Sequence, residues 1–143
     1  MKKKIITALI SVSDKTNLSK VLQTLDKYKI KIISSGGTYK SIKKLGYSCT
    51  EVSAYTGFKE MLDGRIKTLH PKIHAGILHD RSNKKHAKEM SKKKFPSLDL
   101  IIVNFYPFQK IVNDSKSNKE IIENIDIGGP TMVRSAAKTL KMF

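Results

Sequence analysis

The sequence contains little cysteine and no tryptophan. Cys49 is the single cysteine among 143 residues, and aromatic residues make up 7% of the chain. A lone cysteine cannot form an internal disulfide, and such sparse use is typical of a reducing compartment, so we expect a cytoplasmic protein. With so few aromatic side chains, the hydrophobic core has to be built from aliphatic residues.

Long apolar runs are missing too. The densest runs, Ile5–Ile10 and Leu98–Val103, fall far short of the roughly 18 residues that cross a bilayer, so no membrane partner is expected. The basic start at Met1 resembles the start of a signal peptide, but the apolar run behind it is too brief for one. A chain of this length suffices for one compact domain, and we expect a single domain over residues 1–143.

Acidic residues and arginine are scarce. The 12 Asp and Glu residues oppose 28 Lys and Arg, which gives a formal net charge of +16, yet the arginines are only Arg65, Arg81 and Arg134. Such a charge suits nucleic acid, an acidic membrane surface or an anionic small molecule. Because base readout and phosphate contacts favour the guanidinium fork, lysine dominance favours a solvated basic surface over a nucleic-acid partner. The lysine-rich residues 84–94 also lack the aromatic side chains that single-strand binders use.

Strand and helix patterns alternate along the chain. The near-continuous apolarity of Ile5–Ile10 predicts a strand buried on both faces. Apolar residues at i, i+3, i+4 and i+7 from Leu18 to Leu25 predict an amphipathic helix. Further strands are predicted at 29–34 and 98–106, a short helix before Gly46, and two helices at 119–125 and 130–140. This order predicts an α/β domain with an open, mostly parallel sheet flanked by helices in three layers.

The middle of the chain is less regular. Residues 58–62 fit one or two helical turns, residues 64–77 show no clear period, and the highly charged residues 84–94 predict an exposed helix or loop. Long irregular segments inside a compact domain are usually functional. The segment from Arg65 to Pro71 presents two cations and a hydroxyl, which suits ligand binding, although a charged surface loop is slightly favoured on local grounds.

Two loops after predicted strands have the composition of a phosphate site. Glycines in Ser34–Thr38 let the backbone approach an anion closely, and free N–H groups at the start of the following helix would bind it. Ser11–Lys15 supplies two hydroxyls and a cation, and both loops fall at the carboxyl ends of parallel strands. The alternative is a plain turn at Gly36 and helix capping by Asp14 or Thr16.

Three histidines, His70, His74 and His79, raise the question of a metal site. No cysteine or paired carboxylate completes a zinc-like set, and Pro71 is expected to interrupt the helix that a His-x-x-x-His pair needs. No metal site is therefore predicted.

Two later segments border predicted elements. Asn104–Phe108 ends a buried strand and brings Tyr106 to the crevice edge, where aromatic packing is the simpler interpretation. Asp126 precedes a helix on which Arg134 and Lys138 lie four residues apart and share a face. The alternatives here are an acid–base cluster, or helix capping by Asp126 beside two solvated cations.

Taken in order, these segments resemble the cyclohydrolase domain, the N-terminal half, of the bifunctional purine-biosynthesis proteins (AICAR transformylase / IMP cyclohydrolase). The matching stretches span nearly the whole chain: residues 11–16, 35–38, 64–71, 73–78, 104–108, 125–130 and 134–138. The first two are shared by related phosphate-binding domains, whereas the later ones are specific. The resemblance implies a methylglyoxal-synthase-like fold and IMP cyclohydrolase activity, the dehydrative closure of 5-formamidoimidazole-4-carboxamide ribotide to IMP.

The resemblance also implies a site. Its catalytic cluster matches Lys67, Tyr106, Asp126 and Lys138: Lys138 would transfer the proton, tuned by Asp126, while Lys67 would stabilise charge on the formyl oxygen and Tyr106 would relay or position. The substrate-binding segments of the family match Ser11, Ser13, Asp14, Lys15, Ser35, Gly36, Gly37, Thr38, Arg65, Thr68, Asn104, Ile127 and Gly128.

No metal or organic cofactor is implied for this step, since 10-formyltetrahydrofolate would serve only a transformylase domain. The implied partners are a phosphorylated purine-precursor nucleotide and a second copy in a homodimer. Phe105 stands where the family usually has Leu, and Thr139 stands where it has Asn. The family's domain continues beyond the position of Phe143, so the resemblance implies that the C-terminal part of the domain and the transformylase domain are missing here, and that the full-length parent is also a formyltransferase.

Three other functions are weighed against this one. A non-catalytic allosteric domain of the same fold would keep the phosphate loops but lack the segments at 65–71 and 125–129, and methylglyoxal synthase fails on the same grounds. A basic nucleic-acid-binding protein would bind any duplex with a steep salt dependence, and it ranks last.

Overall fold

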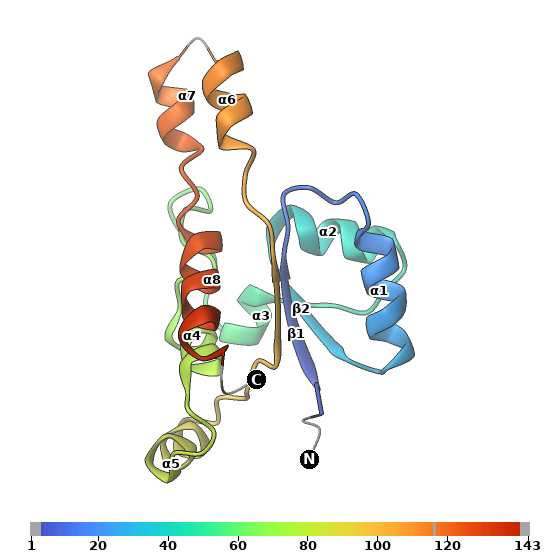
Figure 1. Cartoon of the computed structure of the whole chain (residues 1–143), viewed down its shortest axis with the longest axis vertical. Helices are drawn as coiled ribbons and strands as arrows, with labels where there is room; N and C mark the ends of the chain where they lie inside the picture. The colour runs from blue at the N-terminus through green and yellow to red at the C-terminus, as the bar shows by residue number, and fades with distance from the viewer. Residues whose placement is uncertain (1–3, 116, 141–143) are drawn as a thin grey trace.

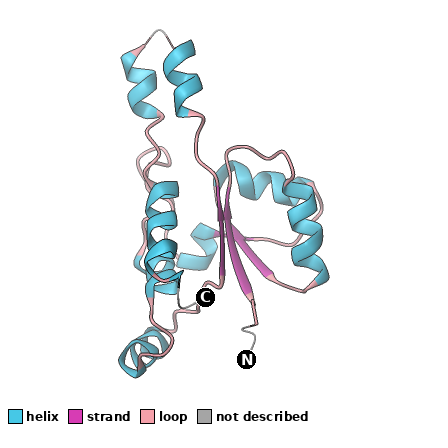
Figure 2. Ribbon diagram, viewed as in Figure 1, coloured by secondary structure: helices cyan, strands magenta, loops and turns pink. Residues whose placement is uncertain are grey.

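A parallel β-sheet forms the centre of the computed structural model, which describes residues 4–115 and 117–140. Within those residues the sheet has four strands in the order β3 (Thr50–Glu51), β2 (Lys31–Ser34), β1 (Thr7–Ser11) and β4 (Leu100–Val103). All neighbouring strands are parallel, and Figure 2 shows strands of this sheet in magenta between the helices. The α/β class with a parallel sheet, predicted from the sequence, is confirmed.

Helices cover both faces of the sheet (Figure 1). One face is covered by α1 (Leu18–Lys27) and α2 (Gly36–Lys44), and the other by α3 (Val52–Thr56), α4 (Pro71–Leu78) and α8 (Gly128–Lys138). The exposed α5 (Lys84–Lys93) lies away from the sheet, in the stretch predicted to be an exposed helix or loop. Among the described residues, no helix has both the length and the apolarity needed to span a membrane.

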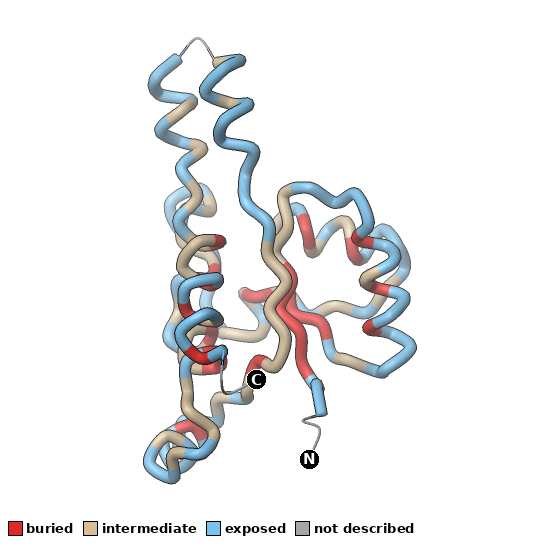
Figure 3. Tube along the Cα trace, viewed as in Figure 1, coloured by how far each residue is buried: buried red, intermediate tan, exposed pale blue. Residues whose placement is uncertain are grey.

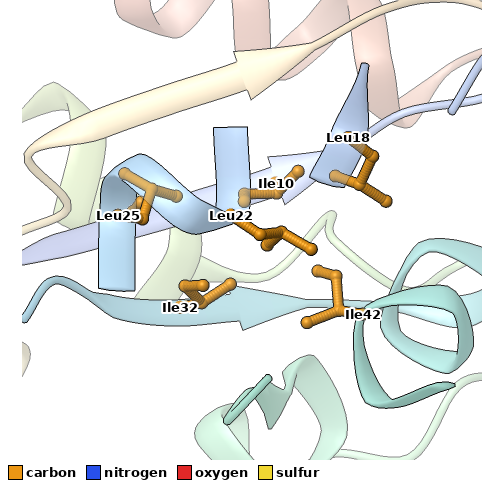
Figure 4. Close-up of a cluster of buried hydrophobic side chains, with 7 residues drawn as sticks. Ile10, Leu18, Leu22, Leu25, Ile32 and Ile42 are labelled. Atoms are coloured by element: carbon orange, nitrogen blue, oxygen red, sulfur yellow. The ribbon is translucent and has the colours of Figure 1, made fainter. Parts of the chain in front are cut away.

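Two aliphatic cores follow from the alternation of side chains along β1. Ala8 and Ile10 face α1 and α2, where Leu22 and Ile42 are fully buried (Figure 4). Leu9 faces the opposite way, into a cluster with Ile33, Val52, Ile73, Ile77, Leu98 and Met132. The predicted apolar stripe of α1 is the face that packs on the sheet.

The strand boundaries differ from the predicted ones. Ile5 and Ile6 are 41% and 52% exposed, because pairing with β2 begins only at Thr7. The strand β4 is half-buried rather than buried, since within the described residues it is the edge of the sheet.

The middle of the chain holds elements that the sequence patterns did not predict. Residues 58–62 are not helical; instead Met61 and Ile66 form an isolated antiparallel bridge. The prediction that Pro71 interrupts a helix was wrong, because Pro71 is the first residue of α4 and the His70 ring accepts a hydrogen bond from the Lys72 N–H at 3.1 Å. The short elements β3 and α3 were missed as well.

Two short helices, α6 (Phe108–Asp114) and α7 (Asn118–Glu123), extend beyond the carboxyl ends of the strands (Figure 1). We call this pair the arm. Its described side chains are exposed or half-buried, and Figure 3 shows it without the red of buried residues. The helix α7 was predicted from the sequence, whereas α6 was not.

Candidate functional site

A cleft of about 580 Å³ opens at the carboxyl ends of β1, β2 and β4. The chain leaves β1 towards β2 on one side and returns to β4 on the other, so the cleft lies at the switch point where open α/β sheets bind ligands. Its volume falls within the range of about 300–1,000 Å³ usual for small-molecule sites. All the predicted site residues except Asp14 and Lys138 line it.

The loop after β1 is shaped by Asn104, which follows β4. Asn104 Oδ1 accepts hydrogen bonds from the backbone N–H groups of Ser13 at 2.5 Å and Asp14 at 3.2 Å, and Asn104 Nδ2 donates to the Asp14 carbonyl at 2.8 Å. The side chain of Asn104 thus holds the loop in place as well as lining the cleft.

Asp14 points away from the cleft. Its carboxylate accepts hydrogen bonds from the Thr16 hydroxyl at 2.6 Å and the Thr16 N–H at 2.8 Å, which hold the pKa of Asp14 below its ordinary value. The alternative predicted for Asp14, capping of the following helix, was wrong, because α1 has Asn17 at its N-cap and no side-chain cap. The Asp14 side chain forms a local turn with Thr16 instead.

The start of α2 forms an anion site. Ser35 has an extended backbone, and its side chain accepts no hydrogen bond from the helix. The first backbone N–H groups of this nine-residue helix are therefore left without a capping acceptor at the cleft. A Cβ placed on Gly36 would lie 3.2 Å from Lys67 Nζ, and one on Gly37 would lie 4.0 Å from Lys15 Nζ. Two ammonium groups therefore flank the helix start, which favours binding of a phosphate.

The predicted residue Thr38 has a structural role at this helix. It is buried, and its hydroxyl donates to the Val12 carbonyl at 2.9 Å and accepts from the Val12 N–H at 3.1 Å. Lys15 Nζ also donates to backbone carbonyls of the same loop, those of Ser13 at 3.0 Å and Val12 at 3.3 Å. The two phosphate loops are thereby fixed to each other.

The Lys67 side chain lies against Gly64, and its ammonium reaches Gly36 at the start of α2. A Cβ on Gly64 would lie 2.5 Å from the Lys67 side chain, and the φ of Gly64 is +86°, so glycine is required there. Lys67 Nζ is 3.4 Å from a carboxylate oxygen of Glu60. This carboxylate lies outside the cleft lining and is the acidic partner of the Lys67 ammonium.

Arg65 lies at the mouth of the cleft, and its guanidinium is paired with a carboxylate of the arm. Its guanidinium makes a two-point contact with the Glu123 carboxylate at the end of α7. This pairing raises the pKa of Arg65 and lowers that of Glu123. The loop around Arg65 is thus tied to the arm, although both side chains remain exposed.

The start of α8 closes the cleft. Asp126 Oδ1 accepts a hydrogen bond from the Gly129 N–H at 2.9 Å, so Asp126 caps the helix and lines the cleft at once. A Cβ on Gly128 would lie 2.7 Å from the Thr68 hydroxyl. The absence of a side chain there lets Thr68 approach the helix start. Tyr106 lies on the same lining, about half exposed, and its hydroxyl forms no hydrogen bond within the described part of the chain.

Lys138 and Arg134 lie away from the cleft. Lys138 ends the eleven-residue helix α8 that begins at Gly128, which at 1.5 Å per residue separates the two by about 15 Å. Both cations are exposed. The structure brings Lys67, Tyr106 and Asp126 of the predicted catalytic cluster together, but it does not bring Lys138 to them.

The three histidines have other partners. His70 caps α4, His74 Nδ1 is 3.0 Å from Ser135 Oγ, and His79 Nε2 is 3.0 Å from Ser97 Oγ. Within residues 4–115 and 117–140, no three His, Cys, Asp or Glu side chains gather as a metal site would require.

Several lining residues were not identified from the sequence, among them Gly64, Ile122, Glu123 and Ile125. The glycine before Arg65 was a usable signal, since it precedes a strongly charged segment. The α7 residues gave none, because only the fold brings them across the cleft.

Comparison with known proteins gives consistent matches. The family model described as "MGS-like domain" matches residues 17–131. The chain is 52% identical to the bifunctional purine biosynthesis protein PurH of Oceanobacillus iheyensis, over 94% of this chain and 26% of that protein. It is 50% identical to PurH of Acetivibrio thermocellus, over 92% of this chain and 26% of the relative. The chain thus spans about a quarter of the length of these curated relatives.

A solved structure is similar as well. The crystal structure of ForH superposes with a TM-score of 0.82 at 28% sequence identity, over 96% of this chain and 69% of the other.

Proposed function

The chain belongs to the MGS-like domain family, and we propose that it acts as the IMP cyclohydrolase part of a bifunctional purine-biosynthesis protein. The substrate is then 5-formamidoimidazole-4-carboxamide ribotide, and the products are IMP and water. The observation that carries this proposal is the presence in one cleft of an anion site at the start of α2 together with Lys67, Thr68 and Asp126.

The nucleotide phosphate binds at the start of α2 in this proposal. The free backbone donors after Ser35 and the ammonium group of Lys15 supply hydrogen bonds and positive charge. The base then extends towards Thr68 and the start of α8, where Ile127 provides apolar contact.

The reaction needs an acceptor for a proton of the carboxamide nitrogen and a donor to the formyl oxygen. The carboxamide nitrogen attacks the formyl carbon, so a C–N bond forms and negative charge develops on the formyl oxygen. The ammonium of Lys67 donates to that oxygen, and the carboxylate of Asp126 accepts the proton from nitrogen. Lys67 transfers a proton to this oxygen, and the protonated Asp126 supplies the second, so the C–O bond breaks and water leaves. The former formamido nitrogen forms the C=N bond and returns its N–H proton to Lys67. No metal or cofactor takes part.

The roles differ in one respect from those implied by the resemblance. Lys138 is about 15 Å along α8 from Gly128, so it does not exchange a proton with a nucleotide in this cleft. We assign the proton to Asp126, whose Oδ2 has no hydrogen-bond donor within the described residues. Tyr106 positions the reacting groups from the facing wall.

The test is ultraviolet detection of IMP when the purified protein meets the formamido ribotide. Lys67→Ala should lower kcat by about 100-fold or more, as loss of an oxyanion donor does. Lys40→Ala, which removes an exposed lysine of α2 outside the cleft lining, is the matched control and should keep normal turnover. Equal rates in both variants would contradict the proposal.

Titration with IMP separates the non-catalytic alternative. Binding of IMP without turnover of the ribotide would favour an allosteric nucleotide-binding domain of the same fold. From the PurH relatives we further propose that the chain belongs to a cytoplasmic homodimer. The same protein would carry a formyltransferase domain that uses 10-formyltetrahydrofolate.

A further inference from the structure

The segment before α4 forms a tight hairpin that carries two cations of the cleft. Met61 and Ile66 form an isolated antiparallel bridge, in which the Met61 N–H donates to the Ile66 carbonyl at 3.1 Å and the Ile66 N–H donates to the Met61 carbonyl at 3.2 Å. Arg65 and Lys67, on the returning side of this bridge, line the cleft. We call residues 60–67 the hairpin.

The turn of the hairpin is left-handed over three consecutive residues. Leu62, Asp63 and Gly64 have φ values of +54°, +53° and +86°. The Gly64 N–H donates to the Met61 carbonyl at 3.1 Å, and the Arg65 N–H donates to the Leu62 carbonyl at 3.1 Å. Residues other than glycine adopt this region at a cost in free energy, and such strain persists only where the surrounding structure enforces it. Leu62 is 62% exposed, so burial of its side chain does not explain the turn.

The turn brings Gly64 against the side chain of Lys67. A Cβ on Gly64 would lie 2.5 Å from Lys67 Cε and 2.8 Å from Lys67 Nζ. The ammonium continues to the start of α2, where a Cβ on Gly36 would lie 3.2 Å from Nζ. The flexible four-carbon stem of this lysine therefore runs between two glycines, and any side chain at Gly64 would have to displace it.

Glu60 faces Lys67 across the hairpin. In an antiparallel pair, the residues next to a hydrogen-bonded bridge face each other at close range, and Glu60 and Lys67 occupy those positions. Glu60 Oε2 is 3.4 Å from Lys67 Nζ, which is longer than the roughly 2.7–2.9 Å of a charge-assisted hydrogen bond. The carboxylate therefore attracts the ammonium and leaves its N–H donors available to a substrate oxygen. Since Glu60 does not line the cleft, it acts on a substrate only through Lys67.

We propose that Glu60 and Gly64 are positioning residues: the hairpin holds the Lys67 ammonium in place before the substrate binds, Gly64 by leaving room for the lysine stem and Glu60 by its charge. A cation that is fixed in advance needs no reordering when charge develops on the substrate. The inference rests on the proposed cyclohydrolase function for its effect on turnover. Its structural part, the restricted side chain of Lys67, is measured separately.

Two glycine variants separate positioning from backbone strain. Gly64→Ala and Gly46→Ala each place a side chain at nearly the same φ, +86° and +84°, but no heavy atom of the described chain lies within 4 Å of a Cβ on Gly46. Both variants should lower the midpoint of thermal unfolding to a similar extent. Only Gly64→Ala should lower kcat, by about 10- to 100-fold, because a small misplacement of a catalytic group costs that much. Equal kcat in the two variants would overturn the proposal.

Glu60→Gln removes the charge and keeps the shape of the side chain. It should lower kcat by about 10-fold with KM nearly unchanged, since Lys67 acts on charge that develops only in the transition state. The midpoint of thermal unfolding should barely move, because the Glu60 side chain is exposed and such pairs contribute little to stability. Glu89→Gln, at an exposed position of α5 outside the cleft lining, is the matched control and should keep the wild-type kcat. Equal kcat in these two variants would contradict the role of Glu60.

A double-mutant cycle tests whether both residues act through Lys67. In the Lys67→Ala background, Glu60→Gln and Gly64→Ala should each change kcat by less than about twofold, because the group that they position is gone. Losses as large as those in the background with Lys67 intact would overturn the proposal, since the two residues would then act elsewhere.

Side-chain dynamics give a measurement that is independent of turnover. Carbon-13 relaxation of the lysine Cε groups in the ligand-free protein should show Lys67 to be more restricted than Lys40, an exposed lysine of α2. Glu60→Gln should raise the mobility of Lys67 towards that of Lys40. Equal mobility of the two lysines in the wild-type protein would overturn the positioning. Absence of IMP formation by the wild-type protein would instead refute the cyclohydrolase function, while the mobility of Lys67 would still decide the positioning.

Discussion

Asn104 accepts a hydrogen bond from the backbone N–H of Ser13 at 2.5 Å, across 91 residues of sequence. Its amide nitrogen donates at the same time to the Asp14 carbonyl. A single side chain at the end of β4 thereby sets the shape of the loop after β1. The strand order β2-β1-β4 makes this contact possible, since it places the two strand ends next to each other.

The first prediction concerns this contact. Asn104→Ala should leave the loop without its donor and acceptor, and we expect nucleotide affinity to fall by about 10-fold, as each lost hydrogen bond of this kind is worth about 1–2 kcal/mol. Calorimetric titration with IMP measures it. Asn113→Ala, an exposed amide on α6, is the control. Unchanged affinity in Asn104→Ala would contradict a role of the contact in shaping the site.

A second prediction compares two glycines with positive φ. Gly36 has φ +54° and Gly57 has φ +76°, and a side chain at either costs about 1–2 kcal/mol of stability. A Cβ at Gly36 also meets Lys67 Nζ at 3.2 Å, whereas no heavy atom of the described chain lies within 4 Å of one at Gly57. Both Gly→Ala variants should unfold at lower urea concentration, but only Gly36→Ala should lose affinity for inorganic phosphate. Equal phosphate binding would argue against the anion site at α2.

The third prediction concerns the pair of Arg65 and Glu123. Glu123→Gln should barely change the midpoint of thermal unfolding, since exposed ion pairs contribute little. It should raise nucleotide affinity by about two- to fivefold, because the carboxylate no longer competes with an anion for the guanidinium. Lower affinity in titration would instead assign Glu123 to substrate binding.

The pH dependence of that pair follows from the same contact. The pKa of Glu123 lies below its ordinary value of 4.5, so its small contribution to stability is present above that value and is lost as the pH falls through the folded-state pKa. Wild-type and Glu123→Gln proteins should therefore converge in unfolding midpoint in acid. A difference that grows as the pH falls would contradict this.

A fourth prediction concerns Asp99 at the opposite end of the sheet. Its side chain is 8% exposed, pairs with Arg81 at 2.7 Å, and accepts from the Ile6 and Thr7 N–H groups at 2.9 Å each. Asp99→Ala leaves these groups without their acceptor and should lower the free energy of unfolding by about 2–4 kcal/mol. Asp80→Ala, at an exposed turn, should cost less than about 1 kcal/mol. Urea unfolding measures both, and the proposed IMP formation by the folded protein should not change in either.

The parts of the fold that could be predicted are those with a clear period. The stripe of α1 and the apolar runs of β1 and β2 are set by burial on one or both faces, so they follow from the sequence. The helix α4 was missed because only Ile73 and Ile77 repeat within it and its glycine, Gly76, packs closely on Leu98. Its start at Pro71 was misinterpreted as a break.

The site could be predicted in part. The motifs led to a family, and the match of the MGS-like domain over residues 17–131 confirms it. They could not show that Asn104 holds a loop, or that Lys138 lies at the far end of α8, because those facts depend on helix length and strand order. Glu123 was also beyond prediction, since its contact with Arg65 joins distant segments.

The stability of the arm is expected to depend on whether the cleft holds a ligand. The helices α6 and α7 bury no side chain among their described residues, yet Ile122 and Glu123 form part of the cleft wall. Segments with so few buried contacts open locally at a small fraction of the global unfolding free energy. If a nucleotide fills the cleft as proposed, its contacts with Ile122 and Glu123 stabilise the arm by the free energy of binding. Amide hydrogen exchange in the arm should therefore slow on ligand binding.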